Sequence, residues 1–112
     1  MKGATALTQA GDVLGTLAYM APEQLRGDHA GPAADVFACG IVLAEMLLGA
    51  PLFVRDTAEA TMRALTDFRV VPDAVRAVAP PGVLRVLERA LALDPAQRQP
   101  NGAVLAAELA SV

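Results

Sequence analysis

The stretch Ala33-Ala34-Asp35-Val36-Phe37-Ala38-Cys39-Gly40-Ile41-Val42-Leu43-Ala44-Glu45-Met46-Leu47-Leu48 forms the centre of the fold predicted for this 112-residue chain. Only Asp35, Cys39 and Glu45 in it are clearly polar, and Gly49 follows as the C-terminal stop of a helix. A helix that is apolar on all sides has to be buried. Residues 33–48 therefore predict a central buried helix, in which Cys39 is expected to be one more small buried residue.

The same region also has the length of a membrane span. Val36 to Val54 covers nineteen residues with one charge, close to the roughly 20 residues that cross a bilayer. Against that interpretation, Glu45 at mid-span is costly in lipid, and Gly49-Ala50-Pro51 breaks the helix soon afterwards. We therefore expect a buried helix and no membrane partner.

Two shorter helices are predicted close to the central one in sequence. Proline is tolerated at the first helical position, so a short helix is expected to begin at Pro22 and to end at Gly27. Asp56 and Glu59 resemble a capping box, and the apolar residues at positions 58, 62 and 65 follow with helical spacing. This second helix is expected to be amphipathic.

The C-terminal part predicts two more helices. The prolines at positions 72, 80 and 81 interrupt the chain, and leucines at 84, 87 and 91 then mark one face of a helix that Asp94-Pro95 closes. Asn101 can cap a last helix, whose apolar stripe runs to position 109. The fold class is therefore all-α, with about five helices around residues 33–48 and an irregular segment at the N-terminus.

The composition favours this fold and excludes several kinds of partner. Hydrophobic residues make up 54% of the chain and aromatic ones only 4%, which suits a helical core of Leu, Val and Ala. The net charge is −3 without a basic stripe, so nucleic acid is not expected as a partner. The single cysteine and the single histidine, His29, exclude an internal disulfide and a zinc site. The N-terminus does not read as a secretory signal, and we expect a cytoplasmic protein.

Three segments carry a resemblance to Ser/Thr protein kinases. Residues 15–23, Gly-Thr-Leu-Ala-Tyr-Met-Ala-Pro-Glu, resemble the end of the activation segment. Asp35-Val36-Phe37-Ala38-Cys39-Gly40 stands where that family has Asp-Val-x-Ser-x-Gly, although Ala38 replaces the usual Ser. Asp94-Pro95-Ala96-Gln97-Arg98 looks like the family's Asp-Pro-x-x-Arg stretch. Order and spacing agree, and Leu7-Thr8-Gln9 points to the bacterial (Hanks-type) enzymes, so the chain resembles the C-terminal lobe of such a kinase.

The resemblance implies roles for residues near the N-terminus. Gly15, Thr16 and Tyr19 would bind the protein substrate, next to the residue that accepts the phosphate. Thr8, with Thr5 as a second candidate, stands where related kinases phosphorylate themselves, and a phosphate there would add roughly −1.5 to −2 charges. Taken without the resemblance, Thr16 satisfies its own turn, and the other two threonines are ordinary exposed loop residues.

The resemblance also implies structural residues. In complete kinases the Glu of Ala-Pro-Glu meets the Arg of Asp-Pro-x-x-Arg, which predicts contact between the Glu23 carboxylate and the Arg98 guanidinium. The alternative is two ordinary surface charges. Asp35 would accept hydrogen bonds from the catalytic loop, or would simply be a negative charge that the helix dipole stabilises at the N-terminal end of the helix. Gly40 belongs to the same motif.

Catalytic residues are not expected in this sequence. Phosphoryl transfer needs a glycine-rich loop, a lysine on the phosphates, a catalytic Asp with an Asn downstream, and a second Asp on magnesium. Here Gly-x-Gly-x-x-Gly, His-Arg-Asp and Asp-Phe-Gly are absent, Lys2 is the only lysine and Asn101 the only asparagine. We expect no metal site and no cofactor for this chain, whereas a complete parent kinase would use ATP and magnesium.

The expected function is therefore that of a fragment of a Ser/Thr kinase, inactive as this chain alone, and its enzyme class stays open. A non-catalytic helical docking module derived from a kinase lobe is the alternative. Residues 1–112 are expected to be one partial domain, with a loop remnant at 1–21 and a helical C-lobe at 22–112. Met1 would follow shortly after Asp-Phe-Gly, which suits a truncated gene, a misplaced start or a split protein. Expected partners are a protein substrate, the missing N-terminal half of the kinase, or a second copy bound through exposed apolar surface.

Overall fold

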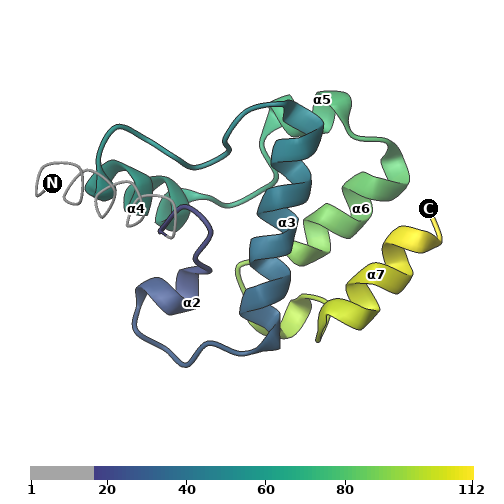
Figure 1. The fold of residues 1–112 in the computed structure, drawn as a ribbon, viewed down its shortest axis with the longest axis horizontal. Coiled ribbons are helices and arrows are strands. Elements are labelled where there is room, and N and C mark those ends of the chain that lie inside the picture. The colour runs from purple at the N-terminus through teal and green to yellow at the C-terminus, as the bar shows by residue number, and fades with distance from the viewer. Residues whose placement is uncertain (1–16) are drawn as a thin grey trace, which may run out of the picture.

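The computed structural model describes residues 17–112. Within that range the chain is all-helical and has no strand, which confirms the predicted fold class. Figure 1 shows α3 crossing the middle, with α2 and α4 on one side of it and α6 and α7 on the other. The elements are α2 (Pro22–Leu25), α3 (Pro32–Leu48), α4 (Ala58–Asp67), α5 (Asp73–Val78), α6 (Pro81–Ala90), the 3-10 helix η1 (Pro95–Gln97) and α7 (Gly102–Ala110).

Helix ends follow the stop and cap signals of the sequence. Gly27, just past α2, and Gly49, just past α3, have φ of 84° and 74°, a left-handed conformation that glycine adopts without strain. The Asn101 side chain accepts a hydrogen bond from the Val104 backbone N–H at 3.0 Å and so caps α7. These three predictions are confirmed.

One prediction on a helix start is corrected by the structure. Thr57, not Asp56, caps α4, because its Oγ1 accepts a hydrogen bond from the Ala60 N–H at 3.1 Å. The described residues form six α-helices, in agreement with the predicted number of about five, and the additional helix α5 forms in the stretch that prolines were expected to interrupt. Pro72 stands directly before α5, where no N–H is needed, and Val75 anchors the helix in the core.

The core lies on one side of α3. Phe37, Ile41 and Ala44 of that helix are fully buried. Phe37 meets the ring of Phe68 edge to face, with centroids 6.4 Å apart, and Phe53 meets the same ring at 5.2 Å. The few aromatic residues of the chain thus gather where α3 contacts the segments on either side of α4.

Gly40 lets α3 and the end of α6 approach closely. A Cβ added at this position would lie 3.0 Å from Leu91 Cδ2 and 3.1 Å from Ala90 Cβ. Real Cβ atoms are rarely so close to their neighbours, so any larger residue here would force Leu91 or Ala90 to shift by a few tenths of an ångström. The structural role that the motif implied for Gly40 therefore has a steric basis in the described residues.

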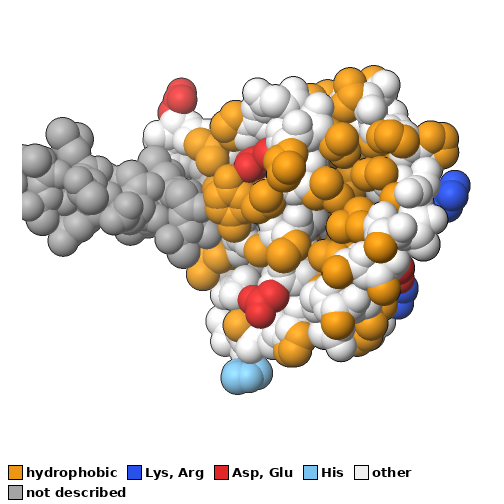
Figure 2. All heavy atoms as spheres, turned by 45° about the vertical axis from the view of Figure 1, so that its right-hand side comes forward, with side chains coloured by type: hydrophobic (Ala, Val, Ile, Leu, Met, Phe, Trp, Pro, Cys, Tyr) orange, Lys and Arg blue, Asp and Glu red, His pale blue; other side chains and the backbone are white. Residues whose placement is uncertain are grey.

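The other side of α3 is not covered, so the exposed apolar surface expected from the sequence lies on this helix, and only the expected burial of Cys39 is wrong. Cys39 is exposed, Val42 is 45% exposed and Met46 74%. Figure 2 shows hydrophobic side chains gathered across one face of the molecule, with acidic groups among them. In residues 17–112, α3 included, no helix has the length and apolar character of a membrane span.

Candidate functional site

The buried ion pair between Glu23 and Arg98 joins residues 75 positions apart in sequence. Glu23 lies in α2, and Arg98 follows η1. Arg98 Nη1 donates to Glu23 Oε2 at 2.7 Å, and Nη2 donates to Oε1 at 2.9 Å. The two parallel bonds match the planar guanidinium to the carboxylate, the geometry that lysine cannot reproduce. The predicted contact is therefore present.

The remaining donors of Arg98 bind backbone carbonyls. Nη1 also donates to Ala33 O at 3.1 Å, Nη2 to Leu93 O at 3.3 Å and Nε to Ala92 O at 2.8 Å. All five N–H groups of the guanidinium thus have acceptors, which a fully buried cation requires. The guanidinium carbon also lies 4.8 Å above the centre of the Phe37 ring. Arg98 therefore connects α2, the start of α3 and the segment after α6.

The charge of Glu23 is stabilised in the folded chain. Burial alone would raise the pKa of this carboxyl. The hydrogen bonds from Arg98 and from the backbone, together with the charges of Arg98 and Arg26, outweigh burial and hold the pKa below its usual value. Glu23 is therefore ionised at neutral pH.

Glu45 links three parts of the structure and was not among the predicted site residues. Its Oε1 accepts the Tyr19 hydroxyl at 2.6 Å, and its Oε2 accepts the Leu52 N–H at 2.9 Å. The hydrogen bond to the Glu45 carboxylate, followed by burial and the nearby negative charge, raises the pKa of Tyr19. A lone acid inside an apolar helix was the available sequence signal, because such a group needs partners.

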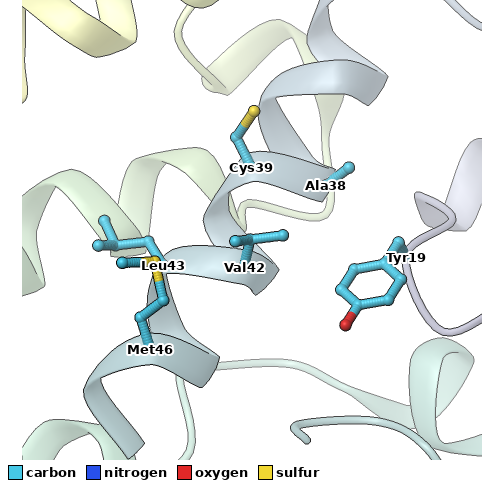
Figure 3. Close-up of a pocket in the computed structure, with 6 residues that line it drawn as sticks. All are labelled: Tyr19, Ala38, Cys39, Val42, Leu43 and Met46. Atoms are coloured by element: carbon cyan, nitrogen blue, oxygen red, sulfur yellow. The ribbon is translucent and has the colours of Figure 1, made fainter.

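A shallow apolar pocket opens beside Tyr19. It has a volume of about 320 Å³, and Figure 3 shows the Tyr19 ring facing side chains of α3 across it. The α3 side chains along this wall include Ala38, Cys39, Val42 and Met46. Cys39 therefore lines an open pocket, where a buried position was expected.

The structure describes only some of the predicted site residues. Gly15 and Thr16, like the phosphorylation candidates Thr5 and Thr8, lie outside the described residues. Tyr19 is described, half-buried, in the segment that leads into α2. Asp35 is exposed in the first turn of α3, where the helix dipole stabilises a negative charge.

Clusters of metal-ligating side chains are absent from the described residues. In residues 17–112 no three side chains of the types His, Cys, Asp and Glu come together as metal ligands. The only lysine, Lys2, lies outside that range. The ion pair of Glu23 and Arg98 and the hydrogen bond between Tyr19 and Glu45 each hold chain segments in place.

Comparisons with known proteins agree with the motifs. The family model described as "Protein kinase domain" matches residues 2–108. The Ser/Thr-protein kinase PknD of Mycobacterium tuberculosis is 39% identical over 94 residues, which cover 82% of this chain and 14% of PknD. The Ser/Thr-protein kinase PknA of the same organism is 36% identical over 109 residues, which cover 97% of this chain and 25% of PknA. The chain thus spans a quarter or less of the length of these two relatives.

Solved structures support the fold. The twitchin kinase region from C. elegans matches with a TM-score of 0.70 at 22% identity, over 82% of this chain and 16% of that one. The family match covers nearly the whole chain, and both bacterial relatives are Ser/Thr kinases. The chain therefore belongs to the protein kinase domain family and covers only part of that domain.

Proposed function

We propose that this chain is part of the C-terminal lobe of a bacterial Ser/Thr protein kinase, which in its complete form transfers phosphate from ATP to Ser or Thr side chains of proteins in the cytoplasm. The observation that carries the proposal is the buried pair of Glu23 and Arg98. It ties the Ala-Pro-Glu triplet to the Asp-Pro-x-x-Arg stretch through two hydrogen bonds. An exposed ion pair between two distant segments would contribute little to the stability of the fold, whereas a buried bidentate pair fixes both segments.

The substrate would be received by the segment ahead of α2. Gly15, Thr16 and Tyr19 belong to the motif that binds a protein substrate in the kinases that this chain resembles. The hydrogen bond from Tyr19 to Glu45 anchors the described end of that segment on α3. Glu45 thus acts as a positioning residue, because it also holds the backbone after α3 through Leu52.

The partner that we propose is the upstream half of a kinase domain. It would bring ATP, magnesium and the catalytic residues, and this chain alone would be inactive. It would also cover the apolar side of α3, where Val42 and Met46 are exposed. Without that partner, the same surface would favour association between copies of the chain.

A docking module without catalysis is the second candidate. The observation in its favour is the apolar pocket of about 320 Å³ along α3, since exposed apolar surface of this kind commonly binds protein. In that case the upstream half of a kinase would not be the partner, and no combination with it would restore phosphoryl transfer.

A chimeric kinase tests the proposal. Residues 1–112 would replace the matching part of the M. tuberculosis kinase PknA, and phosphorylation of a generic basic protein would be measured with ATP and magnesium. We expect activity from the chimera and none from the 112-residue chain. Thr16→Ala and Arg98→Met should each lower the activity of the chimera.

Matched controls make the outcome decisive. Arg26→Met removes an exposed ion pair, in which Arg26 Nε lies 3.6 Å from Asp28 Oδ2, and it should leave activity unchanged. A chimera that folds, as judged by circular dichroism, but transfers no phosphate would favour the docking module. Saturable binding of ATP and magnesium to the chain alone, measured by calorimetry, would contradict the proposed division of labour.

A further inference from the structure

A second cavity lies between the segment that follows α4 and the helices α5 and α6. Its volume is about 110 Å³, and its lining includes Arg69, Val71, Arg76, Glu88 and Leu91. A water molecule needs roughly 10–15 Å³ of such volume, so the cavity has room for a group of several non-hydrogen atoms. It shares no residue with the apolar pocket along α3.

Backbone carbonyls hold the first arginine in place. Arg69 Nη1 donates to Thr66 O at 2.7 Å and to Phe68 O at 2.8 Å. These carbonyls belong to the end of α4, where the last carbonyls of a helix lack partners within the helix. The contacts employ one terminal nitrogen, and among residues 17–112 no acceptor pairs with Nε or Nη2 of Arg69, which keep their donors for a ligand.

The second arginine is fixed in a similar way. Arg76 Nε donates to Val71 O at 3.0 Å, which orients the guanidinium from α5 toward the cavity wall. Its Nη2 lies 3.5 Å from Glu88 Oε2, at the outer limit of a hydrogen bond. Both partners of this pair are more than a third exposed. Such a long, solvent-screened pair is weak, and a stronger anion can displace it.

We propose that this cavity is a binding site for a phosphoryl group, supplied either as inorganic phosphate or as a phosphorylated Ser or Thr side chain of a peptide. Two guanidinium groups against one carboxylate give the lining a formal charge of +1. Planar guanidinium groups match phosphate oxygens through paired hydrogen bonds, and here both are held by the backbone before a ligand arrives. Glu88 competes with the ligand for Arg76 and so sets how tightly the site binds.

The test is a titration of the full 112-residue chain, followed by the Nε–Hε signals of its arginines in proton–nitrogen NMR spectra. The titrants are inorganic phosphate, a phosphothreonine peptide, the same peptide without phosphate, and sodium chloride at equal ionic strength. We expect saturable shifts at Arg69 and Arg76 with phosphate or the phosphopeptide. Replacing both arginines, as Arg69→Gln with Arg76→Gln, should weaken binding about tenfold or more, since charge-assisted hydrogen bonds are lost.

Two further variants keep the inference open to refutation. Arg63→Gln removes an exposed arginine of α4 that lines a different groove, and it should leave the affinity unchanged. Glu88→Gln removes the competitor and should tighten binding several-fold, which gives a readout even if the double variant fails to fold. Equal shifts with sodium chloride, or the same affinity in wild type and Glu88→Gln, would overturn the proposal. Binding of the phosphopeptide far tighter than of phosphate would identify a phosphorylated side chain as the ligand, and equal affinities the free ion.

Discussion

Replacing Arg98 with methionine should remove a large part of the stability of this fold. The Arg98 side chain is fully buried, and the variant leaves the Glu23 carboxylate, only 8% exposed, without its cation. Removing one partner of a buried ion pair costs roughly 3–5 kcal/mol. The carbonyls of Ala33, Ala92 and Leu93 also lose their donor, but these contacts are only partly buried, so water can replace the donor there at a smaller cost.

The loss from the broken ion pair is thus a large part of the stability of a small domain, which is about 5–15 kcal/mol. We therefore expect Arg98→Met to be partly unfolded at 25 °C and Arg98→Lys to recover only part of the loss, because an ammonium cannot make the parallel bonds. The measurement is urea unfolding followed by far-UV circular dichroism, with Arg26→Met as the control for an exposed arginine.

A double-mutant cycle separates the pair from the carbonyl contacts. Glu23→Gln alone should destabilise, because it removes the charge that Arg98 requires. Combined with Arg98→Met, it should cost less than the sum of the single changes, since neither charge is then left unpaired. Strict additivity, or a loss below about 1 kcal/mol for Arg98→Met, would refute the reasoning and place the pair among ordinary surface contacts.

Three more outcomes are expected. The pKa of Glu23 is lower in the folded chain than its usual value of 4.5. The stability that its charge contributes is therefore complete above pH 4.5 and is lost as the pH falls from there through the folded pKa. In acid unfolding curves, Glu23→Gln should flatten this decline. The hydrogen bond to Glu45 raises the pKa of Tyr19 above its usual value of 10.0. The stability that this hydrogen bond contributes is therefore complete below pH 10.0 and is lost as the pH rises through the folded pKa. In urea titrations, Tyr19→Phe should abolish this alkaline decline and lower the free energy of unfolding by about 1 kcal/mol at pH 7. Gly40→Ala should cost roughly 1–3 kcal/mol in thermal unfolding because its methyl group meets Leu91, and a neutral result would show that the α3–α6 crossing relaxes.

Local signals in the sequence predicted much of the fold. Residues 33–48 lie in one helix, Gly49 ends it, and Asn101 caps the last helix, because each of these features depends on neighbouring residues only. The missed helix α5 is six residues long, too short for a periodic pattern, and its stability comes from Val75 inserted in the core. The cap at Thr57 depended on where the first helical turn begins, a choice between adjacent polar residues.

Some contacts of the candidate site could also be predicted from the sequence, and others could not. The partners Glu23 and Arg98 were predicted from motifs, because a resemblance carries a contact across 75 positions that no local pattern encodes. The bond between Tyr19 and Glu45 was not predicted, since it depends on how the segment before α2 crosses α3. The sequence by itself determined every described α-helix except α5 and, through the resemblance, this ion pair. Only the tertiary structure decided which side of α3 is covered, because burial depends on which elements pack against a helix and not on how apolar that helix is.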